Sequence, residues 1–408
     1  MSEVRRRIVE SVRGLRGDGR GWILASIASG WLLTLGLRFL VPAVIPQVKE
    51  TFVVDNATAG IAVTVVWAFY ALTQFPAGLI TDRIGERTAL AGSLAMSAAS
   101  LAFLASAPVF AVFLVGAALF GIGSGFYGPA RGTALSRAFP ARAGAAFGIT
   151  LAAGSFGSAV LPLVAGVAVD ELGWRMLVGG AVPLFLAVSV LAYRVLPEPI
   201  DEYAETTIDT GPTFTLREAV RRVPDAVRDR DVVLAILGLT FYLFAFQGLT
   251  AFLPTYLVDV EGIGQGVASG VFALLFVGGG LTQLAAGSLS DRYGTVPVLV
   301  VAAGFGALTL FAVPFVDSLA AWAVLSFLLG TRMGIAPVAN SSVIAALPTD
   351  AQGASWGFLR TCFFLVSATG SAFVGAMADA DLFDESFLVL GVLTACAAVC
   401  FQRLGATR

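Results

Sequence analysis

Long apolar blocks follow one another along the chain, and only short polar turns separate most of them. A helix of roughly 20 apolar residues spans a hydrocarbon core of about 30 Å, so each block is long enough to cross a bilayer. The composition agrees, because 57% of the 408 residues are hydrophobic and 13% are charged. Soluble domains carry about 25% charged residues. We therefore expect an all-α, polytopic membrane protein.

Hydropathy, together with Pro, Gly and charged turns, predicts twelve transmembrane helices. In chain order, the expected spans are 21–45, 57–80, 88–106, 109–134, 143–168, 175–195, 231–257, 263–288, 295–316, 319–343, 352–377 and 385–403. The expected domains are a tail at 1–20, a six-helix bundle at 21–195, a central loop at 196–230, a second six-helix bundle at 231–403 and a short tail at 404–408.

The central loop is the only long polar stretch of the sequence. Its second part, residues 216–229, places Arg217, Arg221, Arg222 and Arg228 among Val and Ala. Such a pattern is typical of an amphipathic helix that lies on a membrane surface. We therefore expect a surface helix between the two bundles.

The distribution of arginine predicts how the chain is oriented. Arginines occur in the amino-terminal tail, in the turns after the second and fourth spans, in the central loop and at the carboxyl end, whereas the opposite loops hold only Lys49 and Arg175. Cytoplasmic loops retain an excess of Lys and Arg. We expect a multi-pass protein of the cell membrane with both termini in the cytoplasm.

The two predicted bundles repeat one another. Residues 72–85 read LTQFPAGLITDRIG and residues 281–294 read LTQLAAGSLSDRYG, with eight of the fourteen positions identical. Outside these segments, Pro46 and Pro254 keep a similar offset of 208 residues. A constant offset across several helices indicates two copies of a six-helix unit. An even number of spans per copy makes them parallel repeats about an axis along the membrane normal.

The repeated segments carry a resemblance to a known family. GLITDRIGER, Gly78 to Arg87, resembles the loop between helices 2 and 3 of the major facilitator superfamily, and GSLSDRYG, Gly287 to Gly294, resembles its counterpart in the second half. The resemblance covers nearly the whole chain and implies the fold of that superfamily. The chain departs from the motif at Glu86 and Thr295, where the family usually has basic residues.

The resemblance also implies a gate. In the family, the loop aspartate is understood to latch the two halves together at the cytoplasmic side in one state and to release them in the other. By this resemblance, Asp82 would face the start of helix 11, near Asp350 and Gln352. A role in topology and stability alone is the alternative. The residues expected to take part in gating are Gly78, Asp82, Arg83, Gly85, Arg87, Asp291 and Arg292.

Charged residues within the spans are few, and all are arginines: Arg38, Arg131, Arg332 and Arg360. The apolar interiors contain no Asp, Glu or Lys, and the chain has no His. A charge at the bilayer centre costs at least about 2.5 to 3.5 kcal/mol, so each of these arginines requires a reason. Guanidinium groups recognise planar anions such as carboxylate, phosphate or nitrate.

Arg38 precedes Pro42 as an arginine of helix 1 precedes a proline in several anion-carrying branches of the superfamily, and this resemblance implies a substrate contact. Pairing of Arg38 with backbone carbonyls is the alternative. Arg131 is expected to extend toward the cytoplasmic interface. The side chains expected to bind substrate are Arg38, Tyr70, Gln74, Gln247, Arg332, Asn340 and Arg360. For Gln74, Gln283 and the aromatic faces, helix packing is the alternative.

These features predict a secondary active or facilitative transporter that moves a small solute, an anion such as a carboxylate, phosphate ester or nitrate, by alternating access. The absence of an intramembrane carboxylate or His disfavours a proton-driven antiporter of cationic drugs. An efflux porter for amphipathic drugs or other hydrophobic compounds is the first alternative, and a non-transporting receptor on the same fold is the second. We expect no enzymatic activity, no cofactor, no metal, no nucleic-acid partner and a monomer in the bilayer.

Overall fold

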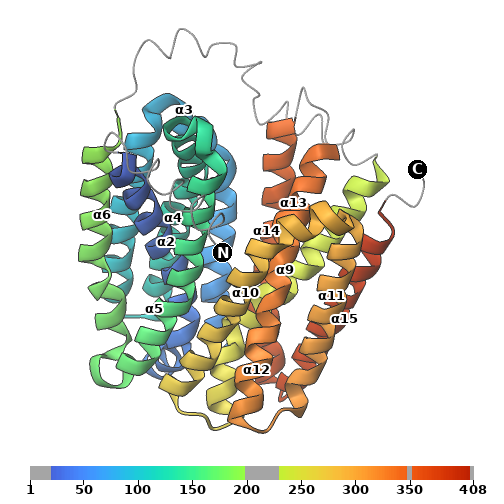
Figure 1. Cartoon of the computed structure of the whole chain (residues 1–408). Helices are drawn as coiled ribbons and strands as arrows, with labels where there is room; N and C mark the ends of the chain where they lie inside the picture. Colours follow the sequence, from blue (N-terminus) through green and yellow to red (C-terminus); the bar gives the residue numbers. More distant parts are fainter. Residues whose placement is uncertain (1–19, 198–228, 347–351, 405–408) are drawn as a thin grey trace, which may run out of the picture.

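The computed structural model describes residues 20–197, 229–346 and 352–404 (Figure 1). Within these ranges the chain forms helices and short connections, and it contains no strand. The first 19 residues of the expected tail and almost all of the predicted amphipathic helix lie outside the described residues. Asp350, an expected partner of Asp82, also lies outside them.

Helices occupy the positions of the predicted spans, although α3 covers two of these spans and the span at 319–343 is divided. Those of the first half are α2 (Arg20–Phe52), α3 (Asn56–Ala105), α4 (Phe110–Ala138), α5 (Ala143–Gly180) and α6 (Val182–Val195), with a 3-10 turn at Pro140–Arg142. Those of the second half are α9 (Arg230–Asp259), α10 (Gln265–Tyr293), α11 (Thr295–Ala312), α12 (Leu319–Gly330), α13 (Ile335–Ala346), α14 (Gln352–Asp379) and α15 (Phe383–Gln402), with 3-10 turns at Val313–Phe315 and Thr331–Gly334.

Ten stretches of the described residues are long and apolar enough to span a membrane. Two of them contain a break at a glycine. Gly85 interrupts α3 with φ 78° and ψ 156°, and Gly173 interrupts α5 with φ 72° and ψ 153°. This backbone region is essentially restricted to glycine. At each of these two places the sequence predicted a polar turn between two spans. The structure instead has a helix that is broken at a single glycine.

Two clusters of buried apolar side chains hold the helices together. One cluster lies between Leu24 and Leu196, and the other lies mainly between Val232 and Phe401. A few residues of α2, α3 and α5, among them Phe39, pack against the second cluster. Figure 1 shows the helices of residues 20–197 gathered on one side and those of residues 229–404 on the other. We call these two groups the N-terminal half and the C-terminal half.

The two halves meet mainly through α3 against α14 and α5 against α10. Small residues let these helices approach closely. A Cβ atom at Gly60 of α3 would lie 2.6 Å from the carbonyl oxygen of Ser371 of α14. Between the same helices, the Thr64 hydroxyl lies 2.8 Å from the Ser371 hydroxyl and 3.0 Å from the Ala368 carbonyl oxygen, to which it donates. Close helix packing and interhelical hydrogen bonds are the forces that join helices within a membrane.

Candidate functional site

A cavity of about 570 Å³ lies between the two halves. Its polar and aromatic wall is formed by Trp31 and Arg38 of α2, Trp67, Tyr70 and Gln74 of α3, Arg131 of α4, Gln283 of α10, Asn340 of α13, and Trp356, Arg360 and Phe364 of α14. Both halves therefore contribute side chains to one cavity. No Asp, Glu, Lys or His occurs among the described residues that line it.

Five of the seven side chains predicted to bind substrate line this cavity: Arg38, Tyr70, Gln74, Asn340 and Arg360. The other two, Gln247 and Arg332, are fully buried and lie outside the lining. Arg332 lies in the 3-10 turn between α12 and α13, where side chains do not follow the spacing of an α-helix. Its Cζ atom lies 5.9 Å from the ring centroid of Tyr242, within the C-terminal half.

Arg131 lines the cavity, although the sequence favoured the membrane interface for it. Its Cζ atom lies 4.1 Å from the ring centroid of Trp31. One helical turn earlier, the Tyr127 ring stacks on Trp31 at 6.3 Å, and its hydroxyl donates to the carbonyl of Ile27 at 2.8 Å. This packing turns the face of α4 that carries Arg131 toward α2. The signal in the sequence was Tyr127 itself, because a tyrosine four residues away on a glycine-rich helix shares its face.

Arg38 is 1% exposed and is surrounded by aromatic rings. Its Cζ atom lies 4.2 Å from the ring centroid of Tyr70, 4.9 Å from that of Trp67 and 5.4 Å from that of Trp31. Its Nε donates to the backbone carbonyl of Thr34 at 3.3 Å. Cation–π contacts and one carbonyl therefore hold the guanidinium group in place. The carbonyl pairing that the sequence left open is present, and it uses only one of the nitrogens.

Arg360 approaches the cavity from the C-terminal half. Its Cζ atom lies 5.5 Å from the ring centroid of Phe364, and the Phe364 ring meets Tyr70 at 6.3 Å. Tyr70 in turn contacts Arg38. The three arginines of the cavity are thus connected through a continuous arc of aromatic side chains.

Several guanidinium nitrogens of the cavity have no hydrogen-bond partner among the described residues: Nη2 of Arg38, Nε and Nη1 of Arg131, and Nε of Arg360. A buried charged donor without a partner costs more than the roughly 1 to 3 kcal/mol of a neutral one. The cavity therefore combines uncompensated positive charge with free donors, which is the chemistry that binds an anion.

Two glutamine side chains at equivalent positions of the repeat, Gln74 and Gln283, both line the cavity. Gln74 also donates through Nε2 to the carbonyl of Gly125 at 2.9 Å, which joins α3 to α4. The Gln74 side chain therefore joins two helices and also lines the cavity. Asn340 presents an Oδ1 atom that has no partner among the described residues.

Further contacts join α2 to the C-terminal half beyond Arg38. Phe39 of α2 meets Phe276 of α10 at 4.6 Å and Phe246 of α9 at 6.2 Å between ring centroids. One turn further along α2, the carbonyl of Ala43 accepts a hydrogen bond from Nε2 of Gln265 of α10. These contacts hold the halves together between Arg38 and the end of the molecule at which α2 ends.

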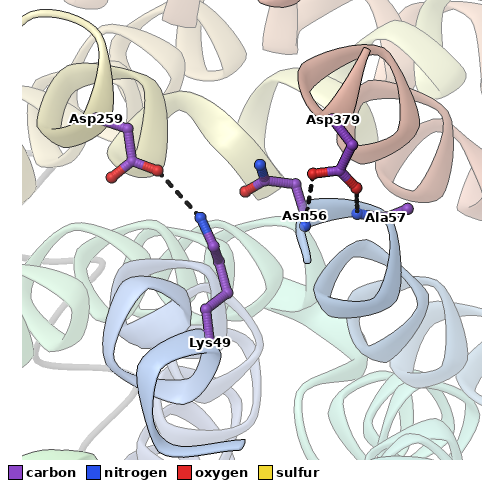
Figure 2. Close-up of polar contacts among 5 residues, drawn as sticks. All are labelled: Lys49, Asn56, Ala57, Asp259 and Asp379. Atoms are coloured by element: carbon purple, nitrogen blue, oxygen red, sulfur yellow. Dashed lines mark hydrogen bonds and ion pairs between the residues drawn. The ribbon is translucent and has the colours of Figure 1, made fainter. Parts of the chain in front are cut away.

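That end of the molecule, which we call the closed end, carries an ion pair between the halves (Figure 2). Lys49 Nζ, near the end of α2, lies 3.1 Å from Asp259 Oδ2 at the end of α9. The side chains are 18% and 39% exposed, so solvent screens the pair. Exposed pairs of this kind contribute about 0.2 to 1 kcal/mol.

A second contact at the closed end joins α14 to the beginning of α3. The Asp379 carboxylate accepts from the backbone amides of Asn56 at 2.9 Å and Ala57 at 2.7 Å, as Figure 2 shows. The next amide of α3, that of Thr58, donates at 2.8 Å to the carboxylate of Asp55, which belongs to the N-terminal half itself. Hydrogen bonds from Thr58 lower the pKa of the Asp55 carboxyl below its ordinary value. A carboxylate at a helix amino terminus satisfies free amides and opposes the helix dipole.

The predicted gating residues lie at the opposite end. Asp82, Arg83, Asp291 and Arg292 are exposed, and Gly85 forms the break in α3. Of the expected partners of Asp82, both Asp350 and the side chain of Gln352 lie outside the described residues. The gating role of these residues, with Gly78 and Arg87, stays a prediction.

Two details of this loop bear on the repeat and on its departure from the family motif. Gly294 adopts φ 88° and ψ 154°, nearly the dihedral angles of Gly85, its counterpart 209 residues earlier. Glu86, the acidic departure, pairs with Arg137 of α4 at 2.6 Å. The basic partner on α4 explains how an acidic residue is accommodated at this position.

A model of the Major Facilitator Superfamily matches residues 26–371 and 262–406 of the chain. Among solved structures, the chain is similar to a bacterial homolog of the human lysosomal transporter Spinster in an inward-facing, unoccupied conformation, with a TM-score of 0.80 and 16% identity over 96% of this chain and 98% of that one. The occupied form of the homolog gives a TM-score of 0.77 and 16% identity over 95% and 97%. Identities this low support the fold alone.

Two curated proteins match part of the chain. The riboflavin transporter RibZ of Clostridioides difficile (strain 630) is 23% identical over 300 residues, which cover 62% of this chain and 65% of that protein. A homolog of the multi-drug resistance efflux pump PmrA from Lactococcus lactis subsp. lactis (strain IL1403) is 26% identical over 171 residues, 41% of this chain and 42% of that protein. In each case the match spans less than two thirds of the relative's own length.

Proposed function

The chain belongs to the Major Facilitator Superfamily and is a multi-pass membrane transporter, and from this premise we propose that it carries a small organic or inorganic anion by alternating access of its two halves. The observation that carries the proposal is the cavity between the halves. Three arginines, Arg38, Arg131 and Arg360, bring guanidinium nitrogens without partners to one space. With no acidic side chain among the described lining residues, an anion is the guest that satisfies them.

The architecture supports twelve spans in two parallel repeats. The breaks at Gly85 and Gly173 divide two of the ten apolar stretches into two spans each. The matching dihedral angles of Gly85 and Gly294 place the same backbone turn in both halves. We assign residues 21–195 and 231–403 to the two repeats, which rock against each other about the cavity.

The distribution of arginine orients the molecule in the cell membrane, with both termini in the cytoplasm. The closed end, with Lys49 and Asp379, then faces outward, and the cavity opens toward the cytoplasm. The proposed substrate contacts are Arg38, Arg131 and Arg360, assisted by side chains that share their wall: Tyr70, Gln74, Gln283 and Asn340. Gln247 and Arg332, which lie outside the wall, are not part of this proposal.

Export of a hydrophobic compound is a second candidate function, and one observation favours it. Trp31, Trp67 and Trp356 line the cavity together with Tyr70 and Phe364, and such aromatic walls also hold apolar ligands. The names of the two curated relatives, a riboflavin transporter and a multi-drug resistance efflux pump homolog, support this candidate. This alternative does not account for three guanidinium groups that lack counter-charges.

Transport by reconstituted protein distinguishes the two functions. Carboxylates, phosphate esters and nitrate are first screened by thermal shift, and those that stabilise the protein are then tested in proteoliposomes. Arg38→Gln should lower uptake of the anion by at least about tenfold, because a charge-assisted hydrogen bond contributes about 1.5 to 3 kcal/mol. Arg194→Gln removes the same charge at the exposed end of α6 and should leave uptake unchanged.

Two results contradict the anion proposal. The first is an Arg38→Gln protein that folds and transports the anion as the wild type does. The second is a protein that no tested anion stabilises but that amphipathic cations stabilise, with no dependence on Arg38. The second result establishes the efflux alternative in its place.

A further inference from the structure

The three arginines of the cavity are divided between the two halves. Arg38 and Arg131 both lie against the Trp31 ring, at 5.4 and 4.1 Å from its centroid, and therefore form one cluster in the N-terminal half. Arg360 belongs to α14 and lies against Phe364 in the C-terminal half. We call these the Trp31 cluster and the Arg360 site.

The ring pair of Tyr70 and Phe364 lies between the Trp31 cluster and the Arg360 site. Arg38 contacts Tyr70 at 4.2 Å, the two rings meet at 6.3 Å, and Arg360 contacts Phe364 at 5.5 Å. The rings meet edge to face, and Tyr70 is 4% exposed. The positive groups are thus separated by two aromatic rings, one of which carries the Tyr70 hydroxyl.

We propose that the guest is an organic dianion with two separated anionic groups, one bound at the Trp31 cluster and one at the Arg360 site, and with a carbon spacer that lies against Tyr70 and Phe364. This inference rests on the proposed anion transport and names the substrate class. A dicarboxylate or a carboxylate that also carries a phosphate ester has this chemistry.

The charge of the cavity favours a dianion over a monoanion. A single carboxylate can accept a planar fork from one guanidinium group, or share two within the Trp31 cluster. Bound there, it leaves Nε of Arg360 without a partner and leaves a net positive charge in a cavity with no acidic residue among the described lining. A second anionic group on the same molecule satisfies that donor and offsets that charge.

The aromatic rings favour an organic guest over a compact inorganic dianion. Phosphate or sulfate keeps its charges within one small group and offers no carbon surface to the Tyr70 and Phe364 rings. The cavity of about 570 Å³ is also much larger than such an ion requires. A carbon chain or ring between two anionic groups fills the space beside Tyr70 and Phe364 without loss of hydration by a charged atom.

Matched ligands that differ by one charge test this inference. Succinate, adipate and suberate, and the monomethyl ester of each, are titrated against the purified full-length protein, and Kd is measured by microscale thermophoresis. At least one diacid should bind about tenfold to a hundredfold more tightly than its own monoester, the ratio expected for one charged hydrogen-bonded contact. Inorganic phosphate and sulfate should bind more weakly than that diacid.

Substitution of one site should remove the preference and leave the other contact intact. Arg360→Gln should bind the diacid and its monoester with equal affinity, close to that of the wild type for the monoester. Arg194→Gln, the matched control outside the cavity, should keep the preference of the wild type.

The possible failures are distinguishable. Equal binding of diacids and monoesters by the wild type, with both abolished by Arg38→Gln, overturns the dianion inference and leaves anion transport standing. Preference for a diacid that persists in Arg360→Gln overturns the assignment of the second group to that site. Failure of every anion, including nitrate and the phosphate esters, overturns both proposals.

Discussion

The carboxylate of Asp379, at the end of α14, accepts a hydrogen bond from the backbone amide of Asn56, the first residue of α3, at 2.9 Å. The two residues belong to different halves and are 323 positions apart in the chain. The free amides that begin every helix need acceptors, and here the opposite half provides one. The alternating access that we propose requires the halves to separate at the closed end, and that separation must break this contact.

Asp379→Asn should increase the population in which the closed end is open. The amide side chain retains one acceptor but loses the negative charge that favours a helix amino terminus, a change of about 0.3 to 2 kcal/mol. Distances between spin labels at positions 50 and 260, in a protein whose three cysteines are replaced by serine, report the opening. Asp381→Asn, at a neighbouring exposed carboxylate, should leave the distance distribution unchanged. Identical distance distributions for Asp379→Asn and the wild type would show that the hydrogen bonds of Asp379 do not control opening of this end.

Lys49→Gln should have a smaller effect than Asp379→Asn and one that depends on salt. The pair with Asp259 is partly exposed, so it contributes about 0.2 to 1 kcal/mol and is screened as ionic strength rises. The same spin-label distances should differ between variant and wild type at low salt and converge at high salt. Lys49→Arg keeps the charge and serves as the control. A salt-independent difference would mean that Lys49 acts through packing instead.

Gly85→Ala should destabilise the protein. With φ 78° and ψ 156°, residue 85 occupies a region that costs a residue with a Cβ atom on the order of 1 to 3 kcal/mol. Thermal unfolding in detergent measures the change in Tm. Gly92→Ala in the same helix is the control, since a Cβ atom there meets nothing within 4 Å and alanine favours the helix. An unchanged Tm for Gly85→Ala would show that the break relaxes without cost.

Arg332→Met should raise the thermal stability and leave anion binding intact. The side chain is fully buried in the C-terminal half, and its three guanidinium nitrogens have no partner among the described residues. Replacement of buried charged groups by apolar residues of similar size is often neutral or stabilising, by about 1 to 4 kcal/mol. Tm and the Kd of the best anion are measured on the same preparation. Loss of anion binding in Arg332→Met would show that Arg332 contributes to the substrate site, as the sequence predicted.

Hydropathy predicted the positions of the helices well, because the bilayer imposes one length and one polarity on every span. Residues 231–257 and 352–377 were predicted, and α9 and α14 cover 230–259 and 352–379. The connections were less predictable. The polar residues from 81 to 87 read as a loop, yet helical structure continues up to Gly85 and beyond it, because polar side chains outside the hydrocarbon do not end a helix.

The lining of the cavity was predictable where charge alone was informative. Arg38 and Arg360 were identified because a charge within a span is costly, and both line the cavity. The same argument could not show that Arg131 lines the cavity and Arg332 does not. The direction of each side chain depends on the local helix form and on the neighbouring helix. Nothing in the sequence indicated the role of Asp379, because its partner amides become neighbours only through tertiary packing.

Lys49 is the one lysine in the sequence, and it lies within the ion pair of the closed end. An amine-reactive ester therefore finds a single side chain to acylate in the whole protein. Its rate of acylation rises when the ion pair with Asp259 separates. The native chain thus contains its own chemical reporter of conformational exchange, which a mass spectrometer can follow without any engineered label.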